Sequence, residues 1–184
     1  MTLRELIGQI SGYRMVVVSG AQRSGTHIMA KILALELGWT YLPDTEYNTG
    51  DNGDWAKYVL EGDGIAIHCP HMSHMLHLVP DDVAVVYMYR PLDEIEESFA
   101  RVNPGEVSCC KNEQMLFYSQ IRGVHGLQTG KVWTKIRNDY WEILQRVVLD
   151  GRGFSFNYHD LEDHPLFYKK RTDWSMNQIE PKGE

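Results

Sequence analysis

The sequence predicts an α/β fold in which a mostly parallel β-sheet carries helices on both faces. Residues 15–18 form an uninterrupted apolar run rich in valine, which is typical of a central strand covered on both faces. A glycine-bearing turn and a helical pattern over residues 26–37 follow, and the same order of strand, turn and helix recurs over residues 83–102. Alternating strands and helices favour a parallel sheet, and such sheets bind ligands beyond the carboxyl ends of their strands.

Hydrophobic periodicity predicts the remaining elements in order. We expect helices at residues 3–10, 26–37, 91–102, 111–122 and 131–149, and strands at residues 15–18, 39–42, 65–68, 83–89 and 154–158. Gly38 would end the second helix, and Pro91 suits the first turn of the third. The last helix has one broad apolar stripe that includes Ile143 and Leu144. Residues 44–54 hold too many Asn, Asp, Gly and Thr residues for a core element, so we interpret them as a functional loop or lid.

Length and composition predict one domain spanning residues 1–184, since the chain is 43% hydrophobic. Its 25 acidic and 18 basic side chains give a formal charge of −7, which argues against a partner that is a nucleic acid or an anionic membrane. Polar residues interrupt the first dozen positions, and no apolar run is long enough for a membrane span. Three cysteines without C-x-x-C spacing fit a reducing compartment, so we expect a cytoplasmic protein. The oligomeric state is not predicted.

A glycine loop between the first strand and its helix predicts an anion site. Gly20 and Gly25 have the G-x4-G spacing of a phosphate-binding P-loop, at a point where backbone N–H groups and the positive end of a helix dipole meet. Thr26 replaces the lysine that follows the second glycine in ATP and GTP hydrolases, and Arg23 inside the loop supplies a cation instead. The alternative is a tight turn with an exposed arginine.

A second anion-binding segment follows the strand at 83–89. Arg90 would lie at the carboxyl end of that strand and Ser98 about two turns into the next helix, so both can face the crevice of the glycine loop. An Arg-Pro pair followed by Asp93 and by Ser98, eight residues after the arginine, resembles the 3′-phosphate-binding segment of sulfotransferases that use 3′-phosphoadenosine 5′-phosphosulfate (PAPS). The resemblance implies a P-loop NTPase-like sulfotransferase architecture. The cofactor-binding residues it implies are Arg23, Ser24, Gly25, Thr26, His27 through its backbone N–H, Arg90 and Ser98.

Two more blocks occur in the order of that family. His68, in Ile-His-Cys-Pro, resembles the catalytic histidine of an H-x-P motif 22 residues before Arg90. Residues 156–165 resemble the family's Y-E-D-L…P segment. Two positions depart from the sulfotransferase pattern. Ala66 stands two residues before His68, where a basic residue is frequent, and Ile28 stands just after the glycine loop, where an aromatic residue is common. Near the end of the sequence, Lys169, Lys170 and Arg171 are loosely similar to a basic segment that closes over the 3′-phosphate, and a solvated surface run is the alternative.

The resemblance implies sulfuryl transfer from PAPS to a hydroxyl or amine of an unidentified acceptor, a small molecule or a carbohydrate, with 3′-phosphoadenosine 5′-phosphate as product and no metal. His68 would be the general base, and Arg23 would stabilise the leaving phosphosulfate. Glu46 competes for the role of base, since carbohydrate-directed members often use a glutamate in this region. Arg90 and Ser98 would distinguish PAPS from ATP.

Other functions fit parts of the same pattern. A P-loop kinase-like phosphotransferase would use ATP–Mg²⁺ but lacks the lysine at position 26, and an inactive nucleotide-binding module would keep the site without turnover. His68, His71, His74 and His77 suggest a zinc site. Positions three apart drift about 60° per step around a helix, so four such side chains cannot converge on one ion from a regular helix, and we expect no metal.

Overall fold

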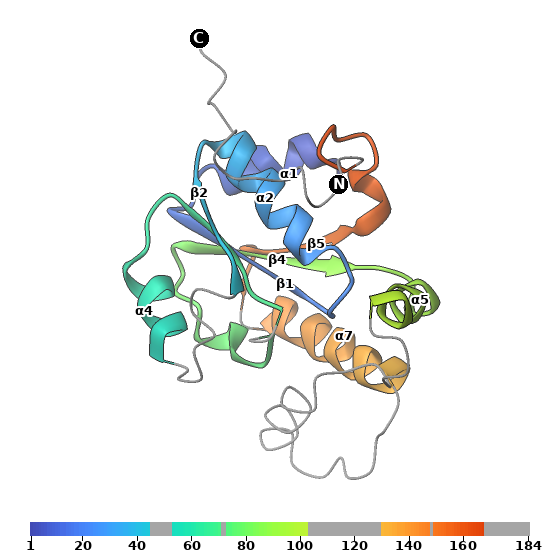
Figure 1. The fold of residues 1–184 in the computed structure, drawn as a ribbon. Helices are drawn as coiled ribbons and strands as arrows, with labels where there is room; N and C mark the ends of the chain where they lie inside the picture. Colours follow the sequence, from blue (N-terminus) through green and yellow to red (C-terminus); the bar gives the residue numbers. More distant parts are fainter. Residues whose placement is uncertain (45–52, 71–72, 103–129, 148, 168–184) are drawn as a thin grey trace.

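The computed structural model describes residues 1–44, 53–70, 73–102, 130–147 and 149–167. These residues form a five-stranded, all-parallel sheet in the order β2-β3-β1-β4-β5, with helices packed on both faces (Figure 1), which confirms the predicted α/β class. The strands are β1 (Met15–Gly20), β2 (Thr40–Leu42), β3 (Ile65–His68), β4 (Val83–Tyr89) and β5 (Gly153–Asn157).

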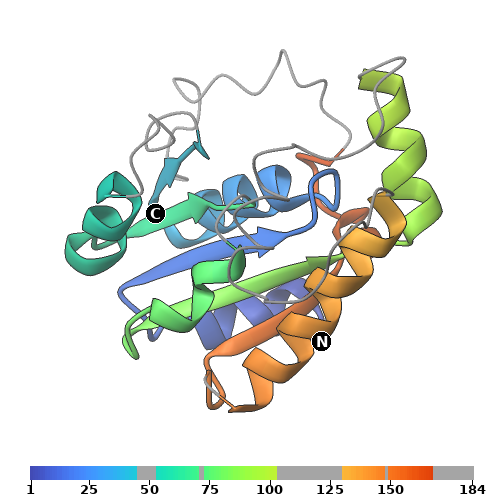
Figure 2. The same ribbon diagram turned by 90° about the horizontal axis from the view of Figure 1, so that it is seen from below.

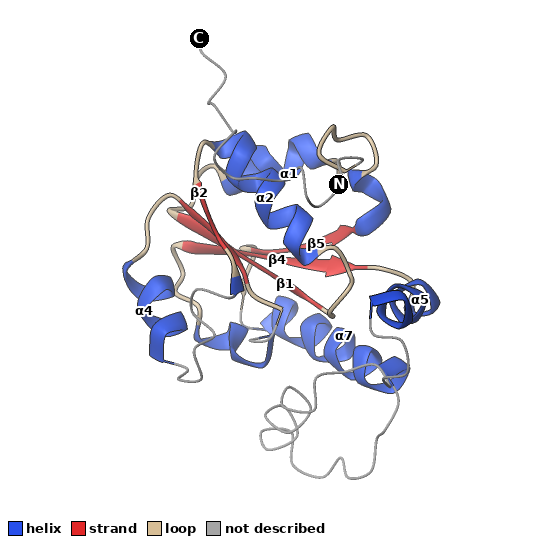
Figure 3. Cartoon of the chain, in the orientation of Figure 1, coloured by secondary structure: helices blue, strands red, loops and turns tan. Residues whose placement is uncertain are grey.

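Two hydrophobic clusters hold the layers together, one on each face of the sheet. The helices that contribute to them lie on opposite faces of the strands (Figures 1 and 3). Along β1, Val16 and Val18 contribute to one cluster, whereas Met15 and Val17 contribute to the other. This division follows from the alternation of side chains along a strand, and it explains why β1 is an unbroken apolar run. The first cluster includes α1 (Leu3–Ile10), α2 (Thr26–Leu37) and the 3₁₀ helix η2 (Tyr158–Leu161); the second includes α4 (Gly53–Glu61), the 3₁₀ helix η1 (Ser73–Leu78) and α7 (Gly130–Val147).

The connections diverge at the centre of the sheet. From β1 the chain crosses through α2 to the β2 edge, whereas from β4 it continues through α5 (Leu92–Val102) and α7 to β5 at the opposite edge (Figure 2). The ends of β1 and β4 are neighbours, because Gly20 pairs with Met88, and His68 at the end of β3 pairs with Val18 of β1. A point where connections diverge is where open parallel sheets form a crevice at the carboxyl ends of their strands. The glycine loop and Arg90 lie at this edge.

The termini of α2 explain why its bounds match the sequence pattern. The helix begins directly after Gly25 and ends before Gly38, which has a left-handed φ of 67° and donates its N–H to the carbonyl oxygens of Ala34 and Leu35. Such a cap suits glycine because a Cβ atom destabilises the left-handed conformation. Helix α1 gains a capping box that the periodicity did not reveal, with Thr2 and Glu5 bonding each other's backbone N–H groups.

Several boundaries differ from the predicted ones. The predicted loop at 44–54 runs too far, because α4 begins at Gly53, and residues 45–52 lie outside the described residues, as does the expected helix at 111–122. Ile143 belongs to the predicted apolar stripe of α7 and is nevertheless 63% exposed, whereas Trp141 and Leu144 on the same helix are buried. Only the narrower stripe faces the sheet, where the Trp141 ring stacks on Tyr87 at 4.8 Å between centroids. In the described part of the chain, no helix is both long and apolar enough to span a membrane.

Candidate anion-binding and catalytic site

Close contacts fix the glycine loop between β1 and α2. Gly20 has a φ of 143° and Gly25 a φ of 94°, and a Cβ atom at these positions would lie 2.7 Å from the Met88 carbonyl oxygen and 2.4 Å from the Tyr158 ring, respectively. Both positions therefore require glycine, for space as well as for conformation. Arg23 also has a positive φ, 69°, which is uncommon for a residue with a side chain and marks a constrained backbone.

The loop presents hydrogen-bond donors at the start of α2. Gly25 caps this helix without a side-chain hydrogen bond, and the first N–H groups of any helix have no partner within it. The Ser24 hydroxyl is buried and donates to the Ala21 carbonyl oxygen at 2.6 Å, so this side chain braces the turn itself. A loop of this form, opening a helix at the end of a central strand, suits a phosphate or sulfate group.

Three of the residues singled out in the sequence meet at this loop. The Arg23 Nε donates to the hydroxyl of Ser98 on α5 at 3.1 Å, and the Arg90 Nη1 donates to the Arg23 carbonyl oxygen at 3.0 Å. The structure thus brings the two arginines and the serine together, although Arg90 and Ser98 lie far along the chain from the loop. Two arginines joined to one loop that opens a helix suit a ligand with more than one negative charge.

Tyr158, the first residue of η2, supports both the loop and Arg90. Its ring is the neighbour that excludes a Cβ atom at Gly25, and the Arg90 guanidinium carbon lies 4.1 Å from the ring centroid. A guanidinium over an aromatic ring is favourable and keeps the planar donor group in one orientation. Tyr158 falls within the block at 156–165, but the sequence pattern assigned it no role.

A chain of ion pairs balances the charge of Arg90. Its Nε lies 3.0 Å from Glu94 Oε2, Glu94 Oε1 lies 2.9 Å from His159 Nε2, and His159 Nδ1 lies 2.7 Å from Glu162 Oε1. The hydrogen bonds from Arg90 and then from His159 lower the pKa of the Glu94 carboxyl. The carboxylates of Glu162 and then of Glu94 raise the pKa of His159. A phosphate that binds Arg90 must therefore compete with Glu94.

His68 lies at the carboxyl end of β3, on the other side of the loop. Its Nε2 is 3.0 Å from the hydroxyl oxygen of Thr26, the first residue of α2, and its Nδ1 is 3.4 Å from Asp44 Oδ1. The ring is buried and meets the His27 ring edge to face at 5.2 Å between centroids. The His27 Nδ1 in turn lies 2.8 Å from the Tyr41 hydroxyl. Asp44 was not predicted as a site residue, although its position just after β2, at the carboxyl edge of the sheet, was a usable signal.

Several of the predicted residues are not among those that the structure describes. Glu46, the alternative base, lies outside the described residues, and so do Lys169, Lys170 and Arg171.

His77, the last histidine of the series considered for zinc, lies with its Nδ1 3.2 Å from the Tyr140 hydroxyl on α7. Within the described ranges, no three His, Cys, Asp or Glu side chains are grouped as ligands for a metal ion.

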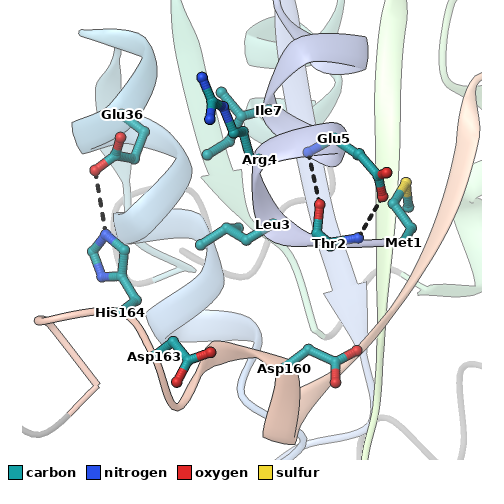
Figure 4. A pocket seen from close by; sticks show the side chains of 10 residues that line it. All are labelled: Met1, Thr2, Leu3, Arg4, Glu5, Ile7, Glu36, Asp160, Asp163 and His164. Carbon is teal, nitrogen blue, oxygen red and sulfur yellow. Dashed lines mark hydrogen bonds and ion pairs between the residues drawn. The ribbon is translucent and has the colours of Figure 1, made fainter.

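A surface cavity of about 840 Å³ lies elsewhere, between α1, the end of α2 and the segment that contains η2 (Figure 4). Carboxylates of Glu5, Glu36, Asp160 and Asp163 are part of its lining, and they outnumber the guanidinium of Arg4 and the ammonium group of Met1. This balance of charge suits an anion poorly, so the edge of the sheet at the glycine loop is the better candidate for a phosphorylated ligand.

Comparison with known proteins adds no assignment: no model of a protein family matches this chain, and no curated protein matches it.

Substitution of Gly25 tests whether the contact with Tyr158 fixes the loop. We expect Gly25→Ala to lower the free energy of unfolding by about 2–4 kcal/mol, because positive φ and a steric clash act together. Gly38→Ala is the matched control, since Gly38 caps the other end of α2 with a positive φ of 67° but has no atom within 4 Å of the added Cβ. The loss in free energy of unfolding for Gly38→Ala should be about 1 kcal/mol. Urea unfolding measures both, and equal losses would contradict the steric role of Tyr158.

The ion pairs of His159 predict a pH dependence of stability. Because its pKa is raised in the folded protein, protonated His159 contributes stability that is fully present below the unfolded pKa of about 6.5 and is lost as the pH rises through the folded pKa. The difference in unfolding free energy between the wild type and His159→Gln should therefore shrink as the pH is raised from about 6 to about 9. Urea titrations across this range measure it. A difference that stays constant or grows would show that the pairs with Glu94 and Glu162 do not form in solution.

Proposed function

We propose that this protein is a PAPS-dependent sulfotransferase that transfers a sulfuryl group to a hydroxyl or amine of a small-molecule or carbohydrate acceptor. The observation that carries the proposal is the meeting of Arg23, Arg90 and Ser98 at the glycine loop. PAPS bears negative charge at two separate places, its 5′-phosphosulfate and its 3′-phosphate. Two cationic side chains from two neighbouring strand ends are suited to such a donor.

The donor would lie across the carboxyl edge of the sheet. Backbone N–H groups of the loop and of the first turn of α2 would bind the 5′-phosphosulfate together with Arg23. Arg90 and Ser98 would bind the 3′-phosphate, with Glu94 displaced from part of the Arg90 guanidinium. The strand order β2-β3-β1-β4-β5, with the glycine loop after the central strand, supports a P-loop-like architecture for this binding mode.

The reaction needs a base on one side of the transferring group and positive charge on the other. The acceptor oxygen forms a bond to sulfur while the bond between sulfur and the bridging phosphate oxygen breaks, and that oxygen leaves as part of 3′-phosphoadenosine 5′-phosphate with the electron pair. His68 would take the acceptor proton, a role typically worth about 10²–10⁴ in rate. Arg23 and the loop N–H groups would meet the charge that grows on the leaving oxygen.

Nucleotide selectivity tests this proposal first. Isothermal titration calorimetry should show that 3′-phosphoadenosine 5′-phosphate binds in preference to AMP and to ATP–Mg²⁺, because only the first places a phosphate on Arg90. Arg90→Ala should lower the affinity for 3′-phosphoadenosine 5′-phosphate by roughly 10- to 100-fold and the affinity for AMP far less. Arg146→Ala, at a 79% exposed arginine on α7, is the control and should change neither. Equal losses for both nucleotides would overturn the 3′-phosphate assignment, and a preference for ATP–Mg²⁺ would favour a kinase-like phosphotransferase.

Two substitutions separate the candidate bases. In an assay of sulfuryl transfer from PAPS over a panel of acceptors, His68→Ala should lower kcat by about 10²- to 10⁴-fold with little change in nucleotide affinity. Glu46→Ala should retain activity. A loss of that size in Glu46→Ala, with His68→Ala fully active, would transfer the role to Glu46. Tight nucleotide binding by the wild type without turnover of any acceptor would favour a binding module.

A further inference from the structure

The surroundings of His68 raise the question of which ring nitrogen carries the proton in the neutral side chain. A general base must present an unprotonated nitrogen to the proton it removes, and the opposite nitrogen then carries the hydrogen. Around His68 the two nitrogens meet different partners, with Asp44 Oδ1 at 3.4 Å from Nδ1 and Thr26 Oγ1 at 3.0 Å from Nε2. A carboxylate accepts hydrogen bonds only, whereas a hydroxyl both donates and accepts.

We propose that the Asp44 carboxylate is a positioning residue that holds neutral His68 with its proton on Nδ1 and so leaves Nε2 as the basic atom. This inference rests on the proposed function for its catalytic meaning, but the tautomer itself is a property of the free protein. Asp44 follows β2 and His68 ends β3, and these neighbouring parallel strands bring the two side chains to the same edge of the sheet.

Electrostatics decides between the two tautomers. With the proton on Nε2, the lone pair of Nδ1 would face the negative Asp44 oxygen, which is repulsive. With the proton on Nδ1, the positive hydrogen replaces that lone pair on the nitrogen 3.4 Å from the carboxylate oxygen, which is attractive, and Thr26 donates its hydroxyl hydrogen to Nε2. The His68 side chain is 9% exposed and that of Asp44 is 24% exposed, so water screens this preference only partly. The separation of 3.4 Å is longer than an ideal N–H···O bond, which leaves Asp44 a mainly electrostatic influence on the ring.

The same arrangement suits the step assigned to His68. Its Nε2 lies beside Thr26, at the beginning of α2 and next to the glycine loop, where the transferring group would be bound. When Nε2 takes the acceptor proton, the ring becomes positively charged, and Asp44 stabilises that charge. Asp44 itself need not touch the substrate or gain the proton. Thr26, which stands where a hydrolase carries lysine, would then serve the base as well as the loop.

Nitrogen NMR of the ligand-free, full-length protein labelled with ¹⁵N at histidine tests the proposal directly. Long-range ¹H–¹⁵N spectra distinguish protonated from unprotonated ring nitrogens, and His68→Gln identifies the signals of His68. At a pH where the ring is neutral, we expect a protonated Nδ1 and an unprotonated Nε2. Asp44→Asn and Asp44→Ala should both raise the share of the Nε2-protonated form. Asp82→Asn, which removes an exposed carboxylate bonded to Arg14, should leave the His68 signals unchanged.

Protonation of Nε2 in the wild type would overturn the proposal, and so would signals of His68 that stay the same in both Asp44 variants. The transfer assay adds a separate reading. Asp44→Asn should lower kcat roughly 10- to 100-fold with an unchanged KM for PAPS, and Asp44→Glu should recover part of the loss. The expected tautomer in a protein that transfers no sulfuryl group would keep the positioning role of Asp44 and reject the proposed function. An active sulfotransferase with the proton of His68 on Nε2 would keep the proposed function and reject the positioning role of Asp44.

Discussion

The parallel pairing of β1 with β4 is the constraint on which the candidate site depends. It runs for six residues and ends with Gly20 opposite Met88, so that both strands end at the same edge of the sheet. The backbones approach so closely there that a Cβ atom at Gly20 would lie 2.7 Å from the Met88 carbonyl oxygen. This contact directs the chain after β1 into the glycine loop. Two residues after Met88, Arg90 can then reach the carbonyl oxygen of Arg23.

Charge at this edge is arranged locally and does not follow from the composition. The whole chain carries a formal charge of −7, yet the Arg90 side chain bonds the backbone of Arg23 in the loop that precedes α2. Glu94 and His159 extend the network, so Arg90 has internal partners, and an anion that bound Arg90 would have to replace one of them. At physiological ionic strength the screening length is about 8 Å, and contacts of this kind therefore outweigh distant acidic residues. A net acidic protein can bind an anionic nucleotide for this reason.

The sequence predicted the elements well where the signal is local. Unbroken apolar runs identified β1 and β4, and Gly25 with Gly38 marked the two ends of α2. These signals are local, because residues adjacent in the sequence determine the backbone conformation and the burial of such elements. It missed partners that only the sheet brings together. Thr26 and His68 are 42 residues apart in the chain, and Glu94 and His159 are 65 apart. Periodicity describes one segment at a time and cannot supply the register of one strand against another. It also cannot say how much of a helix its neighbours cover, and it therefore overstated the width of the buried stripe on α7 at Ile143.

Because threonine stands at position 26 in place of lysine, the cation of the loop and the contact with His68 come from two different residues. Thr26 is buried, and its hydroxyl lies 3.0 Å from the ring of His68, so a long cationic side chain at this position would displace that contact. The cation is carried by Arg23 instead, which needs a left-handed backbone conformation to stand in the loop and reaches Ser98 on α5. Without that lysine, a phosphotransferase that uses ATP would lack the cation that P-loop enzymes place on the β- and γ-phosphates. Both phosphoryl and sulfuryl transfer to a hydroxyl must remove a proton from the acceptor, so the buried histidine fits either reaction, and the missing lysine is the physical reason to prefer the proposed sulfotransferase over the kinase-like alternative.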